Sequence, residues 1–326
     1  MSLAVYYNSD PAPRLSLQQS LPGVPCRLDY LNEGGANFVF RIVSSADDAV
    51  DERLPNKLLR LRKALPHAHS AADQLQAYDA NFKHLFPHEH LIEHELVQLE
   101  GHLPRWLNQT LPYIDRPSHR QGDRLPTEET HGMLVTDLTP RADETLLQIK
   151  PKWLAQSPNA PRGAKRCRTC ALRAQRASKD IRTATDKQES CPLDLVSCDA
   201  SRRHETVSGI SADAELRSYL VEDAQPLLRI LRDQQVSLDP RGVLHADTEE
   251  DVLNVCRAMT LRDCTLFLRR SSEGIEARLG DLDLKQPAKA DRWREVENGL
   301  IEGGWYANDE ADAYHMPEKI CALSRV

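Results

Sequence analysis

The sequence predicts an α+β protein of two lobes, with a strand-rich first lobe and a mainly helical second lobe. Three observations favour this fold class. Short strand-type apolar runs crowd the first half, helical spacing dominates beyond residue 168, and two strand-type runs return after residue 264. A chain of 326 residues can hold one large bilobal domain. We divide it into residues 1–145 and 146–326, and we expect a cleft between the two lobes.

The elements of the first lobe follow from short runs of β-favouring residues. Cys26–Leu31 and Asn37–Ser44 are two such runs, separated by a loop with two glycines. The run KLLRLR at Lys57–Arg62 alternates with period two and fits a third strand. Ser70–Phe86 holds helix formers behind a serine N-cap and stops before a proline. Two more short apolar runs are predicted strands, His131–Asp137 and Leu146–Ile149.

The second lobe is predicted to be mostly helical. Segments rich in proline and polar residues precede it at Asp115–Thr130 and Ser157–Gly163, and these are predicted loops. Beyond them the apolar residues recur with the spacing of helices, except in two runs that are predicted strands. In chain order the predicted elements are the helices Thr169–Ile181, Ala212–Gln235 and Glu249–Leu261, the strands Thr265–Arg269 and Ile275–Leu284, and a helix near Ala290–Leu300.

A basic tract interrupts an otherwise acidic chain. Between Lys150 and Lys187, eleven Lys and Arg residues stand against two acids, Asp180 and Asp186, a local net charge of +9. The whole chain carries −7, so the remainder carries −16. A protein with this balance is not expected to coat nucleic acid or membranes with its whole surface, but it can concentrate cations around one small, highly anionic ligand.

Two pairs of cations within the tract are placed to bind phosphate together. Lys150 and Lys152 flank a proline that keeps the segment extended, so both side chains are expected to point the same way. Arg166 and Arg168 can join them with forked, bidentate contacts that lysine cannot make. A solvated basic face is the alternative interpretation.

Composition excludes several classes of protein. The hydrophobic fraction of 40% is adequate for a core, and no run of about eighteen apolar residues is present to span a membrane. Met1–Pro11 lacks the basic-then-apolar pattern of a secretion signal, so we expect a soluble intracellular protein. Eight cysteines are spread widely, which favours reduced and mostly structural thiols.

Two features of the first lobe suit a nucleotide phosphate site. Gly34, Gly35 and Ala36, followed by Asn37, lie between two predicted strands, where backbone N–H groups can approach phosphate oxygens closely. A hairpin turn with glycines at positive φ is the competing interpretation. Arg60, in the next predicted strand, stands where a cation would meet the α- and β-phosphates, or else it lies on a solvated strand face.

The second lobe offers groups that suit phosphate transfer. On a strand, Asp281, Asp283 and Lys285 would share one face, as two carboxylates for Mg²⁺ and a cation for phosphate. An exposed amphipathic strand with an ordinary ion pair is the alternative. Asp263 lies between a predicted helix and a predicted strand, where an aspartate can accept a proton from an attacking hydroxyl or simply cap the turn.

Two motifs raise the question of a bound metal. His90-Leu91-Ile92-Glu93-His94 matches the H-x-x-E-H pattern of zinc peptidases, in which two histidines one helical turn apart bind zinc. Cys167-x-x-Cys170, together with Cys191 and Cys198, allows a structural zinc site, and free buried thiols are the alternative.

In their order along the chain, these motifs resemble those of the inositol-pentakisphosphate 2-kinases, most closely the compact fungal members. The resemblance spans residues 33 to 285, which is most of the chain. The segments that carry it are EGGAN (Glu33–Asn37), KLLRLRK (Lys57–Lys63), IKPK (Ile149–Lys152), RCRTCALR (Arg166–Arg173), CPLDL (Cys191–Leu195), LRDCTLFL (Leu261–Leu268) and GDLDLK (Gly280–Lys285).

The resemblance implies an ATP- and Mg²⁺-dependent kinase acting on the axial 2-hydroxyl of inositol 1,3,4,5,6-pentakisphosphate to give inositol hexakisphosphate (phytate). It implies a kinase-like, nucleotide-binding first lobe with an antiparallel sheet and a divergent, more helical second lobe that carries the inositide site. The ATP-binding residues it implies are Gly34, Gly35, Ala36, Asn37, Arg60, Asp137 near the hinge, and Gln148. The catalytic residues it implies are Asp263, as the base for the 2-hydroxyl, and Lys150. The substrate-binding residues are Lys150, Lys152, Arg168, Lys285 and Lys289, and the Mg²⁺ ligands are Asp281 and Asp283.

Three positions depart from the family pattern and allow altered affinity or a relaxed choice among inositol phosphates. Gln148 stands where a glutamate usually precedes IKPK, Leu65 where a further substrate-contacting arginine is expected, and Trp293 where plant members have a tyrosine. The alternative function is a module that binds inositol phosphates or RNA through the 150–187 tract without turnover. We expect a monomer in the nucleus or cytoplasm, without a nucleic acid or membrane partner.

Overall fold

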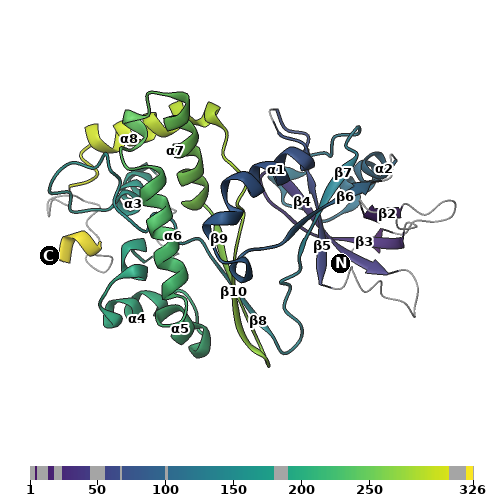
Figure 1. The fold of residues 1–326 in the computed structure, drawn as a ribbon, viewed down its shortest axis with the longest axis horizontal. Helices are drawn as coiled ribbons and strands as arrows, with labels where there is room; N and C mark the ends of the chain where they lie inside the picture. Colours follow the sequence, from purple (N-terminus) through teal and green to yellow (C-terminus); the bar gives the residue numbers. More distant parts are fainter. Residues whose placement is uncertain are drawn as a thin grey trace. The chain divides into compact units, whose positions relative to one another are not determined.

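The computed structural model describes residues 4–5, 14–17, 24–44, 56–66, 68–99, 102–179, 190–307 and 321–325. The chain forms two compact units, one of Met1–Ala80 and Ile92–Thr139, the other of Asn81–Leu91 and Pro140–Val326. Both combine helices with an antiparallel sheet, which confirms the α+β class (Figure 1). The roles predicted for lobes 1–145 and 146–326 stay predictions. The end of the basic tract, from Asp180 to Lys187, lies outside the described residues.

The first unit is built on an antiparallel sheet of seven described strands. Their order is β1-β3-β2-β6-β7-β5-β4, and β3 also pairs with β4, so all but β1 close into a ring of pairings. The strands are β1 (Ala4–Val5), β2 (Arg14–Leu17), β3 (Val24–Glu33), β4 (Asn37–Ser44), β5 (Lys57–Arg62), β6 (His94–Leu99) and β7 (His131–Thr136). The four strands predicted in this region are confirmed. β6 was not predicted, because its His and Glu residues obscure the apolar alternation.

Side chains along β5 point alternately to its two faces, and each face packs in a different hydrophobic core. Leu59 and Leu61 pack in a core that α2 (Leu103–Thr110) covers, whereas Leu58 packs in a second core beside α1 (Ala71–Asn81). The predicted helix that begins near α1 therefore exists, but it ends at Asn81 and a 3₁₀ turn follows.

The second unit combines a three-stranded antiparallel sheet with helices, in the part of the chain that the structure describes (Figure 1). The strand order is β10-β9-β8, with β8 (Thr145–Ile149), β9 (Thr265–Ser271) and β10 (Gly274–Gly280). The helices are α3 (Arg168–Lys179), α4 (Ala200–Ser208), α5 (Ala214–Val221), α6 (Gln225–Leu238), α7 (Glu249–Leu261) and α8 (Ala290–Glu302). α7 has the predicted bounds because Thr248 and Asp251 form a reciprocal capping box at its start.

Three local predictions for this unit were wrong. The single helix predicted over Ala212–Gln235 is two helices, because Pro226 is accepted only in the first turn of α6. The strand predicted over Ile275–Leu284 ends at Gly280, because Asp281 adopts a φ of +58° and leaves the extended conformation. Lys152 has a φ of +62°, so the segment after Pro151 is not extended either.

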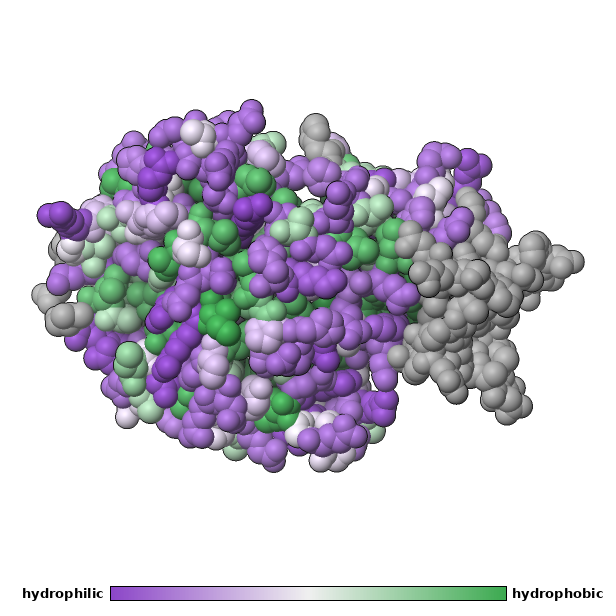
Figure 2. All heavy atoms as spheres, in the orientation of Figure 1, coloured by the Kyte–Doolittle hydropathy of each residue, from purple (hydrophilic) through white to green (hydrophobic). Residues whose placement is uncertain are grey.

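Hydrophilic residues predominate on the face of the described residues drawn in Figure 2. The large hydrophobic side chains that are exposed among the described residues are Leu65, Tyr113 and Val236. Single exposed hydrophobic side chains of this kind are ordinary for a globular surface. Within the described ranges, no helix combines the length and apolar character needed to cross a membrane.

Candidate active site

The loop Gly34–Ala36 joins β3 to β4 in the first unit. The Gly34 N–H donates to the Asn37 carbonyl oxygen and the Lys63 N–H donates to the Ala36 carbonyl oxygen, both at 2.8 Å. The loop is a hairpin turn between the antiparallel strands β3 and β4, as the alternative interpretation predicts, but neither Gly34 nor Gly35 has the positive φ expected of them. No described atom outside their immediate chain neighbours lies within 4 Å of the Cβ position of either glycine. Neither the backbone nor crowding requires glycine here, and the space over the loop is open to a ligand.

Arg60 and Asn37 meet beside this loop. The Asn37 carboxamide oxygen, in the orientation that satisfies both groups, accepts from Arg60 Nε at 3.2 Å and from Nη2 at 2.6 Å. Asn37 is buried, so the pair holds the guanidinium group at the end of the glycine loop. Asp137 follows β7, and its Oδ1 accepts from the Thr139 N–H at 2.7 Å. Its predicted contact with nucleotide stays a prediction.

A buried ion network that the sequence did not reveal anchors the start of the loop. Glu33 accepts from Arg116 Nε at 2.7 Å and from Nη2 at 3.2 Å, and it lies 2.5 Å from Lys63 Nζ. Lys63 is completely buried and also reaches Asp123 at 2.5 Å. Burial by itself raises the pKa of Glu33, but the hydrogen bonds from Arg116 and Lys63 outweigh it and lower that pKa to about 2. Glu33 is therefore ionised inside the unit.

Alternation along β5 would have revealed Lys63. Leu59 and Leu61 face the core, and the period of two places residue 63 on the same face. A lysine at a core-facing position requires a buried carboxylate partner. The sequence does not reveal that Glu33 is this partner, because it lies thirty residues earlier in the chain.

Five predicted site residues converge in the second unit. Asp263 Oδ2 accepts from Lys285 Nζ at 2.8 Å, and Asp263 Oδ1 accepts from Lys152 Nζ at 3.1 Å. Lys150 Nζ donates to the Asp263 carbonyl oxygen at 2.8 Å. The same Nζ lies 3.5 Å from the Asp263 carboxylate and 3.8 Å from that of Asp281. The predicted convergence of these carboxylates with the lysines is confirmed, while their chemical roles stay predictions.

Two of these residues have a left-handed backbone conformation, whereas extended segments were predicted at both positions. Lys152 and Asp281 both adopt positive φ, at +62° and +58°. A non-glycine residue held in this region costs about 1–3 kcal/mol, and such residues concentrate at functional sites. Asp281 and Asp283 therefore do not share a strand face, although Asp281 still reaches the cluster.

The three lysines govern the protonation of Asp263. Burial by itself raises the pKa of the Asp263 carboxyl, but the hydrogen bond from Lys285 and the charges of Lys150 and Lys152 hold it well below its usual range. Asp263 is therefore an anion at neutral pH. Its side chain is 42% exposed, so the carboxylate remains accessible to a ligand.

The Asp281 carboxylate is accessible to a Mg²⁺ ion. Asp281 Oδ2 accepts from the Thr265 hydroxyl and the side chain is 59% exposed, which leaves acceptor positions open. Mg²⁺ is usually held by one or two carboxylates together with substrate phosphates and water, so one such aspartate suffices. The Asp283 carbonyl oxygen accepts from Thr260 at 3.3 Å. Among the described residues, no group of three His, Cys or carboxylate ligands gathers at this place.

A pocket of about 1220 Å³ opens at this cluster, entirely within the second unit. Of the described residues that line it, nine are Lys or Arg, and Asp263 is the single acid. The cations are Lys150, Lys152, Arg168, Arg173, Arg176, Arg262, Lys285, Lys289 and Arg292. Gln148, predicted to contact ATP, and Trp293, a departure from the family pattern, also line it. The arrangement suits a small ligand with many negative charges.

Four of these cations were not predicted as site residues, although helical spacing points to two of them: Arg173, Arg176, Arg262 and Arg292. Thr169, Leu172, Arg173 and Arg176 stand at i, i+3, i+4 and i+7 on α3, and all four line the pocket. A helix face that carries two arginines beside a basic loop predicts an anion site. Arg292 has no comparable signal in the sequence.

Two of the lining arginines are already paired with buried acids. Arg168 Nε donates to Glu297 at 2.8 Å and Arg262 Nη1 donates to Asp239 at 2.6 Å, and all four side chains are buried. Both guanidinium groups also lie over the Trp153 ring, at 4.4 and 3.6 Å from its centroid. Arg168 therefore supports the pocket wall, and its direct contact with substrate stays a prediction.

The histidine motif does not form a metal-binding helix. His90 ends a 3₁₀ turn, and its Nδ1 lies 3.0 Å from the Ala277 carbonyl oxygen. Glu93 binds Lys57 at 2.6 Å, and His94 begins β6. The zinc-peptidase interpretation requires both histidines on one helix, so it is wrong.

An ionised carboxylate, an exposed aspartate and a cation-lined pocket define a class of protein, one that binds a small polyanion. The chain matches the family model described as Inositol-pentakisphosphate 2-kinase over residues 30–246 and 215–299, which together are more than half of its length. It is 28% identical over 216 residues to the inositol-pentakisphosphate 2-kinase of Yarrowia lipolytica, covering 57% of this chain and 68% of that protein. The chain belongs to the inositol-pentakisphosphate 2-kinase family and is a kinase of that family.

Proposed function

We propose that this protein transfers the γ-phosphoryl group of ATP to the 2-hydroxyl of inositol 1,3,4,5,6-pentakisphosphate and releases inositol hexakisphosphate. The observation that carries the proposal is the convergence of Asp263 with Lys150, Lys152 and Lys285 at the cation-lined pocket. Five phosphate groups carry roughly −8 to −10 at neutral pH. Nine cations line the pocket beside one acid, and the seven that remain after Arg168 and Arg262 are paired with buried acids suit a ligand of that charge better than a mononucleotide alone.

In the proposed step, Asp263 takes the proton of the 2-hydroxyl while the hydroxyl oxygen bonds to the γ-phosphorus. The bond from that phosphorus to the β,γ-bridging oxygen breaks, and ADP leaves. In the free protein the three lysines hold Asp263 as a weakly basic anion. Substrate phosphates offer these lysines other anionic partners, so binding of the inositide strengthens Asp263 as a base.

Lys150 lies between Asp263 and Asp281 and is placed to stabilise the transferred phosphoryl group. Mg²⁺, when bound, neutralises charge on the ATP phosphates, and Asp281 would hold it, with Asp283 as a second proposed ligand. Lys152, Lys285, Lys289 and Arg168 are proposed to bind substrate phosphates.

We assign the phosphates of ATP to the first unit, acting as a kinase-like lobe. The open space over Gly34 and Gly35 supports this assignment, since backbone N–H groups without side chains nearby can approach phosphate oxygens. Arg60 supports it too, because Asn37 holds its guanidinium group beside the same loop. Ala36, Asp137 and Gln148 keep the nucleotide-contacting roles that the family resemblance implies.

A product assay tests the proposed function. Purified protein with Mg-ATP and a panel of inositol phosphates should convert the pentakisphosphate to hexakisphosphate, with one ADP formed for each product molecule. Calorimetry that shows tight inositide binding without ADP formation would instead establish the non-catalytic module. Binding of RNA that weakens steeply with salt, without inositide binding, would assign the pocket to nucleic acid.

The arginines of α3 provide a test of the pocket itself. Arg176→Ala should weaken pentakisphosphate binding about ten- to a hundredfold, because a hydrogen bond to a charged group contributes about 1.5–3 kcal/mol. Arg229→Ala removes an exposed arginine of α6 outside the pocket and should leave binding unchanged. Calorimetric Kd values for both variants decide, and an unchanged Kd for Arg176→Ala would exclude Arg176 from the inositide site.

A further inference from the structure

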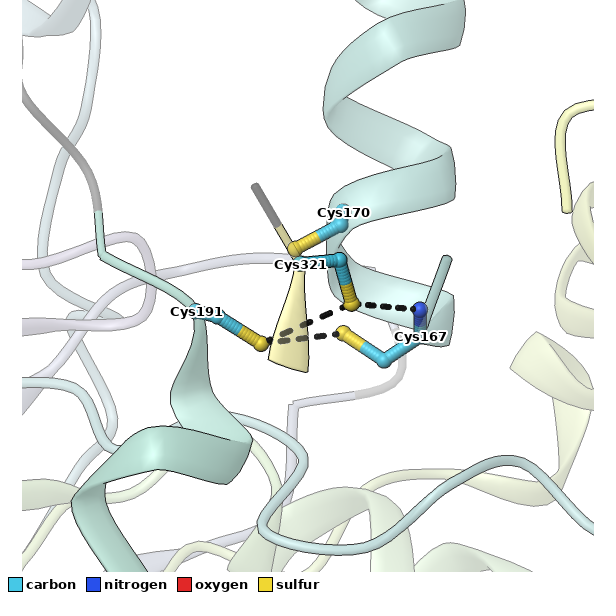
Figure 3. A group of neighbouring side chains, drawn as sticks. All are labelled: Cys167, Cys170, Cys191 and Cys321. Carbon is cyan, nitrogen blue, oxygen red and sulfur yellow. Dashed lines mark hydrogen bonds between the residues drawn. The ribbon is translucent and has the colours of Figure 1, made fainter. Parts of the chain in front are cut away.

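Four cysteine thiols from three separate segments gather at the start of α3, a helix that lines the pocket. Cys167 directly precedes this helix and Cys170 lies in its first turn, and both side chains point toward those of Cys191 and Cys321 (Figure 3). The set predicted from the sequence is wrong at one position, because Cys198 is exposed and lies outside this cysteine cluster, and Cys321 takes its place. Zinc binding by the cluster stays a prediction. Its contacts connect α3, one wall of the pocket, to two distant segments.

The segment that carries Lys150 and Lys152 is held by the amide side chain of Gln235. This residue lies in the last turn of α6 and is 1% exposed. Its Oε1 accepts from the Leu154 N–H at 3.0 Å, and its Nε2 donates to the Lys152 carbonyl oxygen at 2.9 Å and to the Leu261 carbonyl oxygen at 3.2 Å. A primary amide has two donor hydrogens, and both are used here. Gln235 therefore binds the lysine segment and the end of α7 at the same time.

The two segments that Gln235 joins supply groups that meet in the candidate active site. Lys152 Nζ, from the first segment, lies 3.1 Å from Asp263 Oδ1, and Asp263 follows closely after the end of α7. Lys152 has a φ of +62°, and a non-glycine residue keeps such a conformation only where its surroundings fix it. Gln235 binds the backbone at Lys152 and at Leu154, so it stabilises this left-handed turn.

The last turn of α6 also holds the residue that directly precedes Asp263. Arg262 Nη2 donates to the Gln235 backbone carbonyl oxygen at 3.3 Å, and Arg262 Nη1 donates to Asp239 at 2.6 Å. The same guanidinium group lies 3.6 Å from the centroid of the Trp153 ring, and Trp153 belongs to the lysine segment. The end of α6 therefore binds both the segment with the lysines and the segment with the proposed base.

We propose that Gln235 is a positioning residue for phosphoryl transfer, which fixes Lys150 and Lys152 relative to Asp263 and does not touch the substrate. Gln235 is buried and is not among the described residues that line the pocket. Most of the cations that line the pocket belong to other segments, so loss of the Gln235 amide should disturb the transfer step more than binding of the pentakisphosphate. The inference rests on the proposed function, because it concerns the reaction in which Asp263 is the base.

Gln235→Met keeps the length of the side chain and removes its hydrogen bonds. It should lower kcat about tenfold to a hundredfold, because a displacement of about 1 Å in a reacting group can have an effect of that size, and it should weaken pentakisphosphate binding by a smaller factor. The matched control is Gln225→Met. Gln225 is also buried, begins the same helix and donates from Nε2 to two backbone carbonyl oxygens, those of Leu195 and Leu220. This control should lower the melting temperature comparably but keep the wild-type kcat. Initial rates give kcat, and calorimetry gives Kd.

Crystal structures of the two variants provide a measurement that does not depend on turnover. Lys152 Nζ should move away from Asp263 in Gln235→Met and stay beside it in Gln225→Met. If Gln235→Met fails to fold, Gln235→Glu decides, because an ionised carboxylate still accepts from the Leu154 N–H but lacks the two donors, so kcat should fall in the same way. A wild-type kcat in a folded Gln235 variant, an equal loss of kcat in Gln225→Met, or an unmoved Lys152 would overturn the proposal. A wild-type protein that forms no hexakisphosphate, with Lys152 displaced only in the Gln235 variant, would contradict only the proposed function.

Discussion

Asp263→Asn should lower the rate of inositol hexakisphosphate formation by about 10²- to 10⁴-fold, the loss expected when a general base is removed. The amide has nearly the same shape as the carboxylate, but it cannot accept the proton of the 2-hydroxyl. Pentakisphosphate should still bind, and at least as tightly, because Asp263 pairs with Lys152 and Lys285 in the free protein. The amide leaves these cations free for substrate phosphates. Initial rates give kcat, and calorimetry gives Kd.

The control for this variant is a second Asp→Asn change on the same unit. Asp291 on α8 is 89% exposed and pairs with Arg294 three residues later, so Asp291→Asn should match the wild-type kcat and Kd. A wild-type kcat for Asp263→Asn would exclude Asp263 as the base. Parallel loss of kcat and of inositide binding would mean that Asp263 supports the pocket instead of taking a proton.

Glu33→Ala should lower the free energy of unfolding of the first unit by about 3–5 kcal/mol, the usual loss when one partner of a buried ion pair is removed. Arg116, whose side chain is 1% exposed, would lose its carboxylate partner, and the fully buried Lys63 would be left with Asp123. Urea titration measures the change. Glu128→Ala is the matched control, because the Glu128–Arg105 pair is exposed to solvent and its loss should leave the stability nearly unchanged.

The ion network around Glu33 should also make the stability of the first unit depend on pH in acid. The pKa of Glu33 falls from 4.5 to about 2 on folding, so its stabilisation is complete above pH 4.5 and is lost as the pH falls toward 2. The stability difference between wild type and Glu33→Gln should therefore shrink over this range. A difference that stays constant down to pH 2 would mean that Glu33 acts through packing rather than charge.

Much of the candidate site could be predicted because its residues belong to short motifs with local meaning. Lys57–Arg62 forms a strand because its apolar residues alternate, and Glu249–Leu261 forms a helix because its capping residues are adjacent in sequence. Asp263, Lys150, Lys152 and Lys285 were recognised as parts of ordered motifs, and family membership is confirmed. Such patterns depend on residues that are close together in the sequence, so they can be recognised without knowledge of the fold.

Other features depend on contacts between distant segments, so only the tertiary structure decided them. The end of β10 depends on the left-handed turn at Asp281, which is held beside Thr265. The fourth cysteine of the cluster is Cys321 rather than Cys198, because packing brings together segments that lie far apart in the sequence. The sequence by itself determined many of the strands and helices, the family and several of the charged groups. The tertiary structure decided which of these groups share a site, because burial and charge pairing depend on distances in space.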